Sequence, residues 1–344
     1  MAAGLNKVAR NHILIRDTSA LEQMRNVDVV VFDKTGTLTE GHPTVIGWLW
    51  AQGQEEHYKD VLLAAESTSD HPLAEAIVTA LEGEEQVIPA HLDGFENITG
   101  KGVRVAYQGA EYWVGSHKLL KDYQANLSDI LADMLTQYES DGNSIVYFGR
   151  ENDLLAVIAI KDQLRVTSME AIRELRIQDI EICMLTGDGE RTASSVAGSL
   201  GIMRFVADAM PDDKEDFIHK LQLQGKTVAM VGDGVNDAQA LSCADVSIAM
   251  GKGTDTLMDT AMITLRTSDL LLLPKVFRLS RQTVSLMYRN LFWAFIYNTV
   301  GIFVAAGVLY PVYDILLSPA LAGAAMALSC VSVALSSLRL SSRF

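Results

Sequence analysis

Residues 27–39 read Val-Asp-Val-Val-Val-Phe-Asp-Lys-Thr-Gly-Thr-Leu-Thr, an apolar run that ends at Asp33 and continues into a turn with Gly36. A short apolar run that stops at a polar turn is typical of a buried parallel strand. A carboxylate in that place can attack the terminal phosphorus of a nucleotide and form an acyl phosphate. Backbone N–H groups of the turn would bind the phosphoryl oxygens. The stretch therefore makes Asp33 a candidate phosphoryl acceptor, with ordinary turn formation by an Asp at a strand end as the alternative.

Three further apolar runs end at polar loops, and helix-like stretches such as Arg191–Leu200 and Lys214–Leu223 lie among them. This alternation predicts an α/β domain with a doubly wound parallel sheet. In such sheets the loops at the carboxyl ends of the strands form the active site. The three runs are Ile182–Leu185, Val228–Val231 and Val246–Met250.

A second pattern interrupts the first between about residues 44 and 153. Strand-like pieces occur there at Gly102–Tyr107 and Glu111–Val114. We expect an α+β domain, 44–153, to be inserted into a phosphorylation domain formed by 27–43 and 154–268.

The last part of the chain is almost free of charge. From Leu291 to Leu338 the only ionisable carboxylate or base is Asp314. Leu291–Tyr310 and Ile315–Leu338 each have about the 20 residues that a helix needs to cross a bilayer. Arginines on both outer sides favour cytosolic ends. We predict a transmembrane helix hairpin at 291–338, after a juxtamembrane helix at 269–290 and before a cytosolic tail at 339–344; the alternative is a pair of buried core helices.

Composition limits the partners and the compartment. The formal net charge of −15 argues against nucleic-acid binding, which needs a basic surface. The three cysteines lie far apart with no C-x-x-C pair, so neither a disulfide framework nor a zinc site is indicated. The N-terminus has no apolar run of signal-peptide length.

The stretch DKTGTLT at residues 33–39 resembles the phosphorylation signature of P-type ATPases. Three further signatures of that family follow in order: Thr-Gly-Asp at 186–188, Pro211 with Lys214, and Gly-Asp-Gly-Val-Asn-Asp at 232–237. The resemblance implies a haloacid-dehalogenase-like phosphorylation domain, ATP as substrate and Mg²⁺ as cofactor.

The resemblance also implies roles for single residues. Mg²⁺ is expected at Asp33, Thr35 and Asp233, because hard carboxylate oxygens suit that ion. Lys214 and Thr186 would contact the equatorial phosphoryl oxygens. The full catalytic set expected from the motifs is Asp33, Lys34, Thr35, Thr186, Gly187, Asp188, Lys214, Asn236 and Asp237.

Thr35 distinguishes the chain from another enzyme class. Soluble phosphatases with the same strand and nucleophile carry a second Asp two residues later, which acts as general acid and base. Because residue 35 is threonine here, we expect a long-lived phosphoaspartate and disfavour a phosphatase.

In the inserted domain, Ser-Asp-His-Pro-Leu at 69–73 resembles a motif of the heavy-metal-transporting branch, where the histidine orients the nucleotide. Glu66 precedes it, and Gly100-Lys101-Gly102 matches a glycine loop of the same branch. The resemblance implies ATP binding at Glu66, His71, Gly100 and Gly102. Ser116 stands where the branch usually has Asn, which leaves a nucleotide contact there unsupported.

The predicted hairpin indicates the cargo. Its residues Tyr297, Asn298, Met326 and Ser329 resemble motifs of copper-transporting members, although Phe303 and Cys330 replace a proline and a serine. Soft sulfur ligands suit Cu(I). We expect Cu(I) at Tyr297, Asn298, Met326, Ser329 and Cys330, with Ag(I) as a surrogate and a zinc or cadmium pump as the alternative.

The resemblance implies that the complete protein is about twice as long and has, in addition, a Cys-Pro-Cys metal site and an actuator domain. Gly4–Asp17 is similar to the cytosolic link after the Cys-Pro-Cys helix, so residues 1–26 are expected to be that link. We expect a C-terminal portion of a pump in the plasma (inner) membrane of a prokaryote, with its bulk in the cytosol. Expected partners are the lipid bilayer, the N-terminal half of the pump and a copper chaperone. The alternative is a truncated, membrane-anchored fragment that binds nucleotide or metal and transports nothing.

Overall fold

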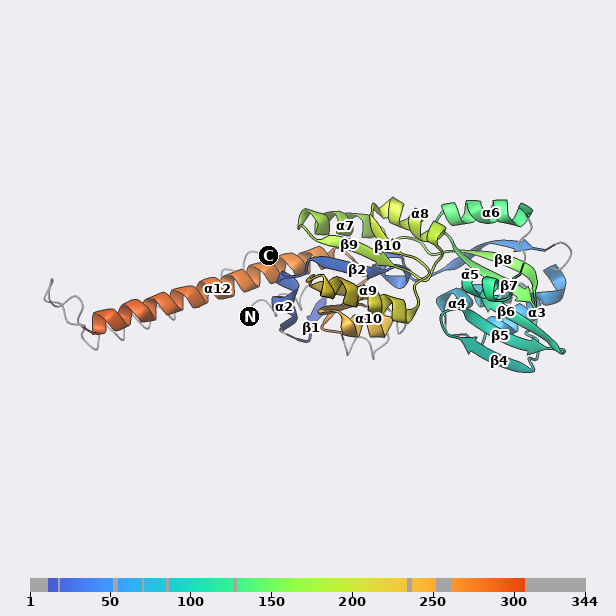
Figure 1. Cartoon of the computed structure of the whole chain (residues 1–344), viewed down its shortest axis with the longest axis horizontal. Helices are drawn as coiled ribbons and strands as arrows, with labels where there is room; N and C mark the ends of the chain where they lie inside the picture. Colours follow the sequence, from blue (N-terminus) through green and yellow to red (C-terminus); the bar gives the residue numbers. More distant parts are fainter. Residues whose placement is uncertain are drawn as a thin grey trace.

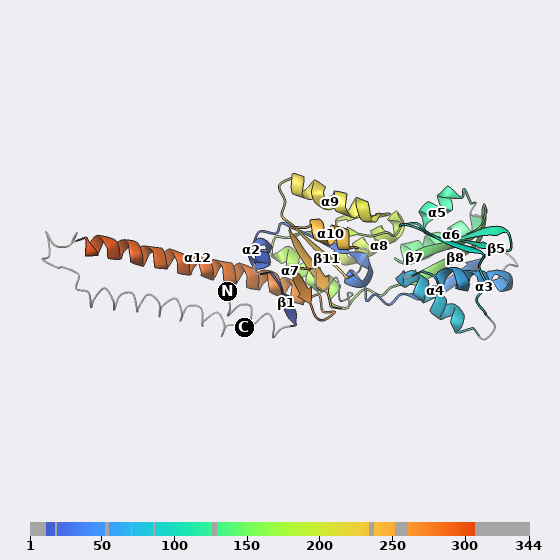
Figure 2. The ribbon, with the colours of Figure 1, turned by 90° about the horizontal axis from the view of Figure 1, so that it is seen from below.

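The structure is a computed structural model, and it describes residues 12–17, 19–51, 55–69, 71–84, 87–125, 129–233, 237–251 and 261–306. These residues form two sheets, each covered by helices on both faces, and a long helix that extends away from them (Figures 1 and 2). The first sheet has the strand order β1-β13-β12-β11-β2-β9-β10, and the second has the order β3-β8-β7-β6-β5-β4.

The first sheet is parallel except at one edge, where β1 runs antiparallel to β13. The predicted α/β phosphorylation domain is therefore confirmed, with one antiparallel edge strand added. Its strands are β1 (Ile13–Ile15), β2 (Val29–Asp33), β9 (Glu181–Leu185), β10 (Arg204–Val206), β11 (Val228–Gly232), β12 (Val246–Met250) and β13 (Ile263–Leu265).

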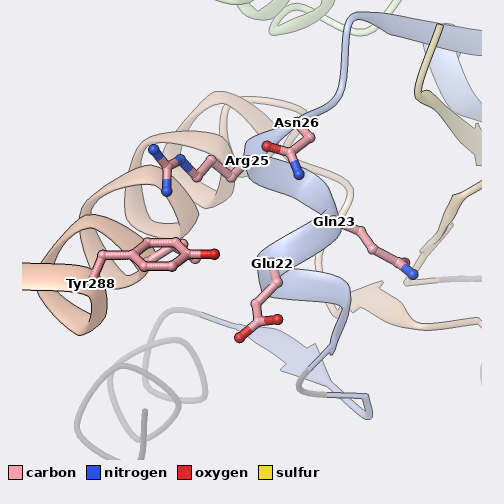
Figure 3. Close-up of a pocket in the computed structure, with 6 residues that line it drawn as sticks. Glu22, Gln23, Arg25, Asn26 and Tyr288 are labelled. Carbon is pink, nitrogen blue, oxygen red and sulfur yellow. The ribbon is translucent and has the colours of Figure 1, made fainter. Parts of the chain in front are cut away.

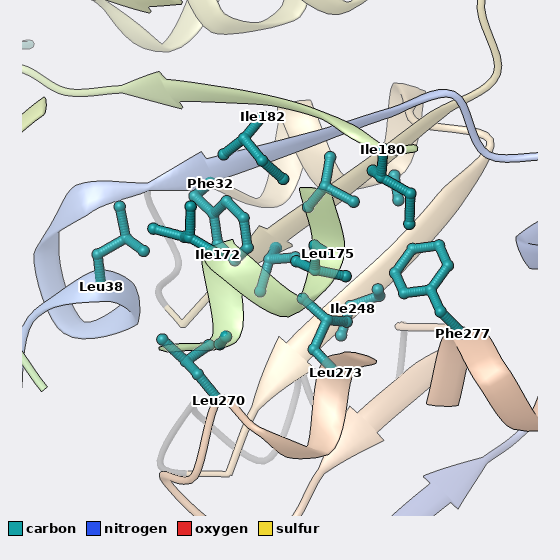
Figure 4. Close-up of a cluster of buried hydrophobic side chains, with 14 of the residues drawn as sticks. Phe32, Leu38, Ile172, Leu175, Ile180, Ile182, Ile248, Leu270, Leu273 and Phe277 are labelled. Carbon is teal, nitrogen blue, oxygen red and sulfur yellow. The ribbon is translucent and has the colours of Figure 1, made fainter. Parts of the chain in front are cut away.

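Alternate residues of β2 enter two different cores, as a buried strand with helices on both faces requires. Val30 and Phe32 pack in the core shown in Figure 4, together with α7, α8, α2 and the start of α12. Val29 and Val31 pack on the opposite face against α9 and α10. These helices are α2 (Ser19–Arg25), α7 (Ser168–Ile177), α8 (Glu190–Leu200), α9 (Pro211–Leu223), α10 (Ala238–Cys243) and α12 (Leu272–Ala305).

The second sheet is antiparallel throughout. Helices α3 and α4 cover one face, and α5 and α6 cover the other around Trp113 and Tyr147. Because β8 continues to Lys161 within this sheet, the sheet extends beyond the predicted boundary at Asp153. The elements are β3 (Thr44–Trp50), α3 (Glu55–Glu66), α4 (Pro72–Glu82), β4 (Gly94–Ile98), β5 (Gly102–Tyr107), β6 (Ala110–Gly115), α5 (His117–Asp122), α6 (Asp129–Ser140), β7 (Ser144–Arg150) and β8 (Asp153–Lys161).

Helix α12 is continuous through the boundary predicted near Leu291. Its N-terminal half packs against α2. Arg25 lies over the Tyr288 ring at 5.4 Å, and a small pocket opens beside Glu22 and Asn26 (Figure 3). None of the helices within the described ranges has both the length and the apolar character that crossing a membrane requires. The second predicted span, 315–338, lies outside the described residues.

Candidate active site

Asp33 is the last residue of β2, and its neighbours in the sheet carry the other motifs. Strand β9 ends beside it at Leu185, so the Thr-Gly-Asp stretch begins directly next to Asp33. On the other side β11 ends at Gly232, and Asp233 follows. The parallel order thus brings three motifs to one sheet edge, although they are far apart in the sequence.

The turn after Asp33 requires a glycine. Lys34–Leu38 form a tight π-type turn (η1) in which Gly36 has φ of +71°. A Cβ atom on Gly36 would lie 1.5 Å from Oδ2 of Asp233. Only glycine therefore permits both the left-handed backbone and the close approach of Asp233.

Lys214 binds the Asp33 side chain. It lies on the first turns of α9, and its Nζ donates to Oδ1 of Asp33 at 2.6 Å and to Oδ1 of Asp237 at 2.7 Å. All three side chains are buried. Burial alone would lower the pKa of Lys214, but the two carboxylates outweigh it and raise that pKa above its ordinary value. Lys214 is therefore a permanent cation beside the Asp33 carboxylate.

Three carboxylates converge at this point. Oxygens of Asp33, Asp233 and Asp237 lie within 4.8 Å of one another. Burial, and next the charge of Asp33, raise the pKa of Asp233 and that of Asp237 to about 7. Such crowding of hard oxygen ligands suits a divalent cation, which would relieve the repulsion. The residues present fit Mg²⁺. Of the predicted ligands, Asp33 and Asp233 belong to this cluster and Thr35 lies in the turn that follows Asp33, while Asp237 is an additional carboxylate.

The Thr-Gly-Asp loop is joined to Lys34. Lys34 forms a buried ion pair with Asp188 and donates to Oγ of Ser144, on β7 of the inserted domain, at 3.0 Å. The Thr186 hydroxyl donates to Oδ2 of Asp188 at 2.9 Å. Although burial opposes it, the charge of Lys34 lowers the pKa of Asp188. Lys34 and Thr186 therefore hold the Asp188 side chain in place, and Gly187 lies between Thr186 and Asp188 in the loop.

His71 lies close to the phosphorylation loop although it belongs to the inserted domain. Burial lowers the pKa of His71, and the charges of Asp188, Lys34, Asp33 and Lys214 also act on it. The ring caps α4, since its Nδ1 accepts the N–H of Leu73 at 3.2 Å. An accepting Nδ1 places the ring proton on Nε2, which leaves an N–H donor for a nucleotide.

Gly100 also borders the phosphorylation domain. It has φ of +69°, and a Cβ there would lie 2.8 Å from Sδ of Met210, the residue that precedes α9. Gly102, with φ of +144°, passes so close to β6 that a Cβ would lie 2.1 Å from the Val114 carbonyl oxygen. Gly100 thus allows close approach to the start of the helix that carries Lys214, and Gly102 allows close approach of β5 to β6.

Two residues that the motifs did not identify hold the phosphorylation loop. Asp162 accepts the Thr39 hydroxyl at 2.5 Å and the Gly41 N–H at 3.1 Å. Arg165 donates to the Thr37 carbonyl at 2.9 Å and to the Gly36 carbonyl. Both follow β8, where the chain returns from the inserted domain. The only sequence signal was a pair of charges directly after a buried strand.

The remaining predicted residues are only partly described. Tyr297 and Asn298 lie exposed on α12, where the Tyr297 ring is 5.8 Å from that of Trp293. Asn236, Met326, Ser329 and Cys330 lie outside the described residues.

Glu66 gives a prediction for stability. Burial raises the pKa of Glu66 from 4.5 to about 7. The folded chain then keeps a proton that the unfolded chain has lost, so the stability that Glu66 contributes is fully present below pH 4.5 and is lost as the pH rises through 7. Replacing Glu66 by Gln should remove this loss, which is about 3 kcal/mol in full. Urea unfolding at several pH values checks it: the advantage of Glu66→Gln should grow from pH 5 to pH 8, and a constant difference would contradict the assignment.

Comparisons with known proteins agree with this geometry. Residues 27–245 match the family described as haloacid dehalogenase-like hydrolases. A copper-exporting P-type ATPase of Legionella pneumophila is 42% identical over 337 residues, which cover 98% of this chain and 46% of the relative. A silver exporting P-type ATPase of Salmonella typhimurium is 43% identical over 342 residues, which cover 98% of this chain and 41% of the relative.

A solved zinc-transporting PIB-type ATPase in the E2.Pi state superposes with a TM-score of 0.67 at 34% identity, over 98% of this chain and 54% of that chain. The chain belongs to the haloacid dehalogenase-like hydrolase family. The predicted resemblance to the catalytic portion of heavy-metal P-type ATPases is confirmed by these relatives. The chain spans less than half the length of the two curated relatives.

Proposed function

We propose that this chain transfers the γ-phosphoryl group of ATP to Asp33, as the catalytic part of a metal-exporting pump. The observation that carries the proposal is the buried Asp33 carboxylate, held by Lys214 at 2.6 Å beside Asp233 and Asp237. An oxygen of Asp33 attacks the γ-phosphorus, the bond from that phosphorus to the bridging oxygen breaks, and ADP leaves with the electron pair. Because Lys214 binds Oδ1, we assign the attack to Oδ2.

The surrounding residues lower the electrostatic cost of this step. Lys214 neutralises charge on the attacking carboxylate and on the phosphoryl group that approaches it. Arg165 and Asp162 fix the turn, so that its N–H groups keep their directions when the phosphoryl group arrives. Mg²⁺ held by Asp33, Asp233 and Asp237 would supply the positive charge that offsets repulsion between the carboxylate and the phosphate.

Nucleotide binding should depend on His71. Its Nδ1 caps α4 and leaves Nε2–H as a donor, and the ring feels the charges of the phosphorylation loop. His71→Ala should therefore weaken ATP binding by about tenfold, the effect of one lost hydrogen bond to a charged ligand. Calorimetry with ATP measures the change. His91→Ala, which alters an exposed histidine of the same domain, should bind as the unaltered chain does. Equal affinities for all three proteins would remove His71 from the site.

For the transported ion we propose Cu(I), with Ag(I) as a surrogate. The support is the sulfur pair Met326 and Cys330 in the sequence and the relatives named as exporters of copper and silver. The zinc-transporting structure keeps a zinc pump as the competing candidate. We further propose a bilayer location, which the exposed apolar side chains of α12, Leu291, Phe295, Ile302 and Phe303, support.

Competition with a Cu(I) chelator in detergent tests the cargo. The measurement is made in a Cys243→Ser background, which removes a partly exposed thiol. We expect Met326→Ala and Cys330→Ala each to weaken Cu(I) binding by about tenfold or more, and Zn(II) to bind far more weakly. Met134→Ala, at an exposed position of α6, should change nothing. Equal affinity for zinc and copper would reject the copper assignment.

A further inference from the structure

A second group of metal-ligating side chains lies outside the carboxylate cluster. Glu215 and His219 are one turn apart on α9, and Cys243 is the last residue of α10. The two helices pack side by side (Figure 2). One ligand atom from each of the three residues lies within 4.8 Å of the others. The side chains of Glu215 and His219 remain 36% and 52% exposed, so solutes can reach the group.

The spacing is close to that of a bound transition metal. Nε2 of His219 lies 3.5 Å from Oε1 of Glu215. Bond lengths of about 2.0 Å to nitrogen or oxygen and about 2.3 Å to sulfur place tetrahedral ligand atoms roughly 3.3 to 3.6 Å apart. The His219–Glu215 distance therefore already fits one ion, and Sγ of Cys243 lies within 4.8 Å of both ligand atoms.

A neighbouring amide orients the imidazole for this role. Nε2 of Gln222 donates to the Cys243 carbonyl at 2.9 Å and to Oδ2 of Asp245 at 3.3 Å. Its Oε1 is thereby fixed toward Nδ1 of His219, at 3.1 Å. Since an amide oxygen only accepts hydrogen bonds, Nδ1 carries a proton. In the neutral imidazole the lone pair is then on Nε2, the nitrogen that lies 3.5 Å from Glu215.

We propose that Glu215, His219 and Cys243 bind a borderline transition cation such as Zn²⁺, with a fourth position open to water. Thiolate and imidazole ligands exclude Mg²⁺ and Ca²⁺, and one carboxylate with one thiolate suits a divalent ion. The ion joins α9, which carries Lys214, to α10, which directly follows Asp237. Lys214 and Asp237 form an ion pair next to Asp33. A metal at this site would therefore bridge the two helices that position this ion pair.

Cobalt provides the test, because a thiolate–Co²⁺ bond gives a charge-transfer absorption that an all-oxygen site lacks. The whole chain is titrated in detergent with excess Mg²⁺ and in a Cys330→Ser background. We expect one equivalent of Co²⁺ to develop the band and Zn²⁺ to displace it. Cys243→Ser should abolish the band, and His219→Ala and Gln222→Ala should each weaken binding by about 10 to 100-fold.

Cys183→Ser and His91→Ala are the matched controls, since they remove a buried thiol and a distant imidazole. Both should leave the titration unchanged. A band that persists in Cys243→Ser, an unaltered affinity in His219→Ala, or no saturable binding would each overturn the proposal. Phosphorylation of Asp33 does not enter this readout, so the site can fail while the proposed function stands, and the reverse.

Discussion

Asp33→Asn should abolish the acid-stable phosphoenzyme that the chain forms with ATP and Mg²⁺. The amide nitrogen and oxygen of Asn cannot replace the carboxylate oxygen that bonds to phosphorus, so the covalent step has no nucleophile. The change is nearly isosteric and removes one of three crowded carboxylates, so the fold should be kept. Labelling from γ-labelled ATP, followed by acid precipitation and hydroxylamine treatment, is the measurement.

Asp216→Asn serves as the matched control, because Asp216 is exposed on α9. It should be labelled like the unaltered chain, and the label should be lost in hydroxylamine. ATP affinity of Asp33→Asn, measured in parallel, establishes that the variant still binds nucleotide. Labelling that survives in Asp33→Asn would show that another residue is the nucleophile.

Lys214→Met should slow phosphoenzyme formation by about 10² to 10³-fold, the usual cost of losing one positioned charge in a transition state. Its Nζ is the group that binds Asp33 and Asp237 together, at 2.6 and 2.7 Å. Without it the buried carboxylates repel one another and the incoming phosphate. ATP binding through the inserted domain should change little, so the loss should appear in the rate constant of labelling. Rapid-quench kinetics at saturating ATP separate the two quantities.

Lys220→Met is the comparison for that experiment. Lys220 lies on the same helix with its side chain exposed, and its loss removes the same net charge. Labelling of Lys220→Met should be as fast as that of the unaltered chain. If Lys214→Met and Lys220→Met were equally fast, Lys214 would have no role in the transfer.

The buried strands of the phosphorylation domain could be predicted because each is a continuous apolar run that stops at a polar loop. The predicted runs at 182–185, 228–231 and 246–250 lie in β9, β11 and β12. The edge strand β1 and its neighbour β13 have three residues each, too few for a period to be recognised. Their pairing depends on contacts between the two ends of the domain, which the local sequence does not contain.

The site was predictable where a residue type itself supplies the chemistry, as at Asp33, Asp233 and Lys214. It was not predictable where a residue acts through backbone groups. Arg165 binds carbonyl oxygens of the turn after Asp33, and nothing in its own neighbourhood indicates that contact. The partners of Lys34, Asp188 and Ser144, become neighbours only after both domains have formed.

Helix α12 shows a different limit. The loss of charge predicts a boundary near residue 290, but no proline or glycine lies near that residue, and the helix continues from Leu272 to Ala305. The loss of charged residues along α12 therefore marks a change in the surroundings of the helix and not the end of the helix.

The most direct test of the central claim is to locate the phosphorylated residue. The chain is incubated with ATP and Mg²⁺, quenched in acid and treated with borohydride, which reduces an aspartyl phosphate to homoserine. Mass spectrometry of the peptide that contains residues 27–39 should then find homoserine at position 33 and aspartate there when ATP is omitted. Homoserine at any other position, or unmodified Asp33 in a chain that has incorporated phosphate, would contradict the account.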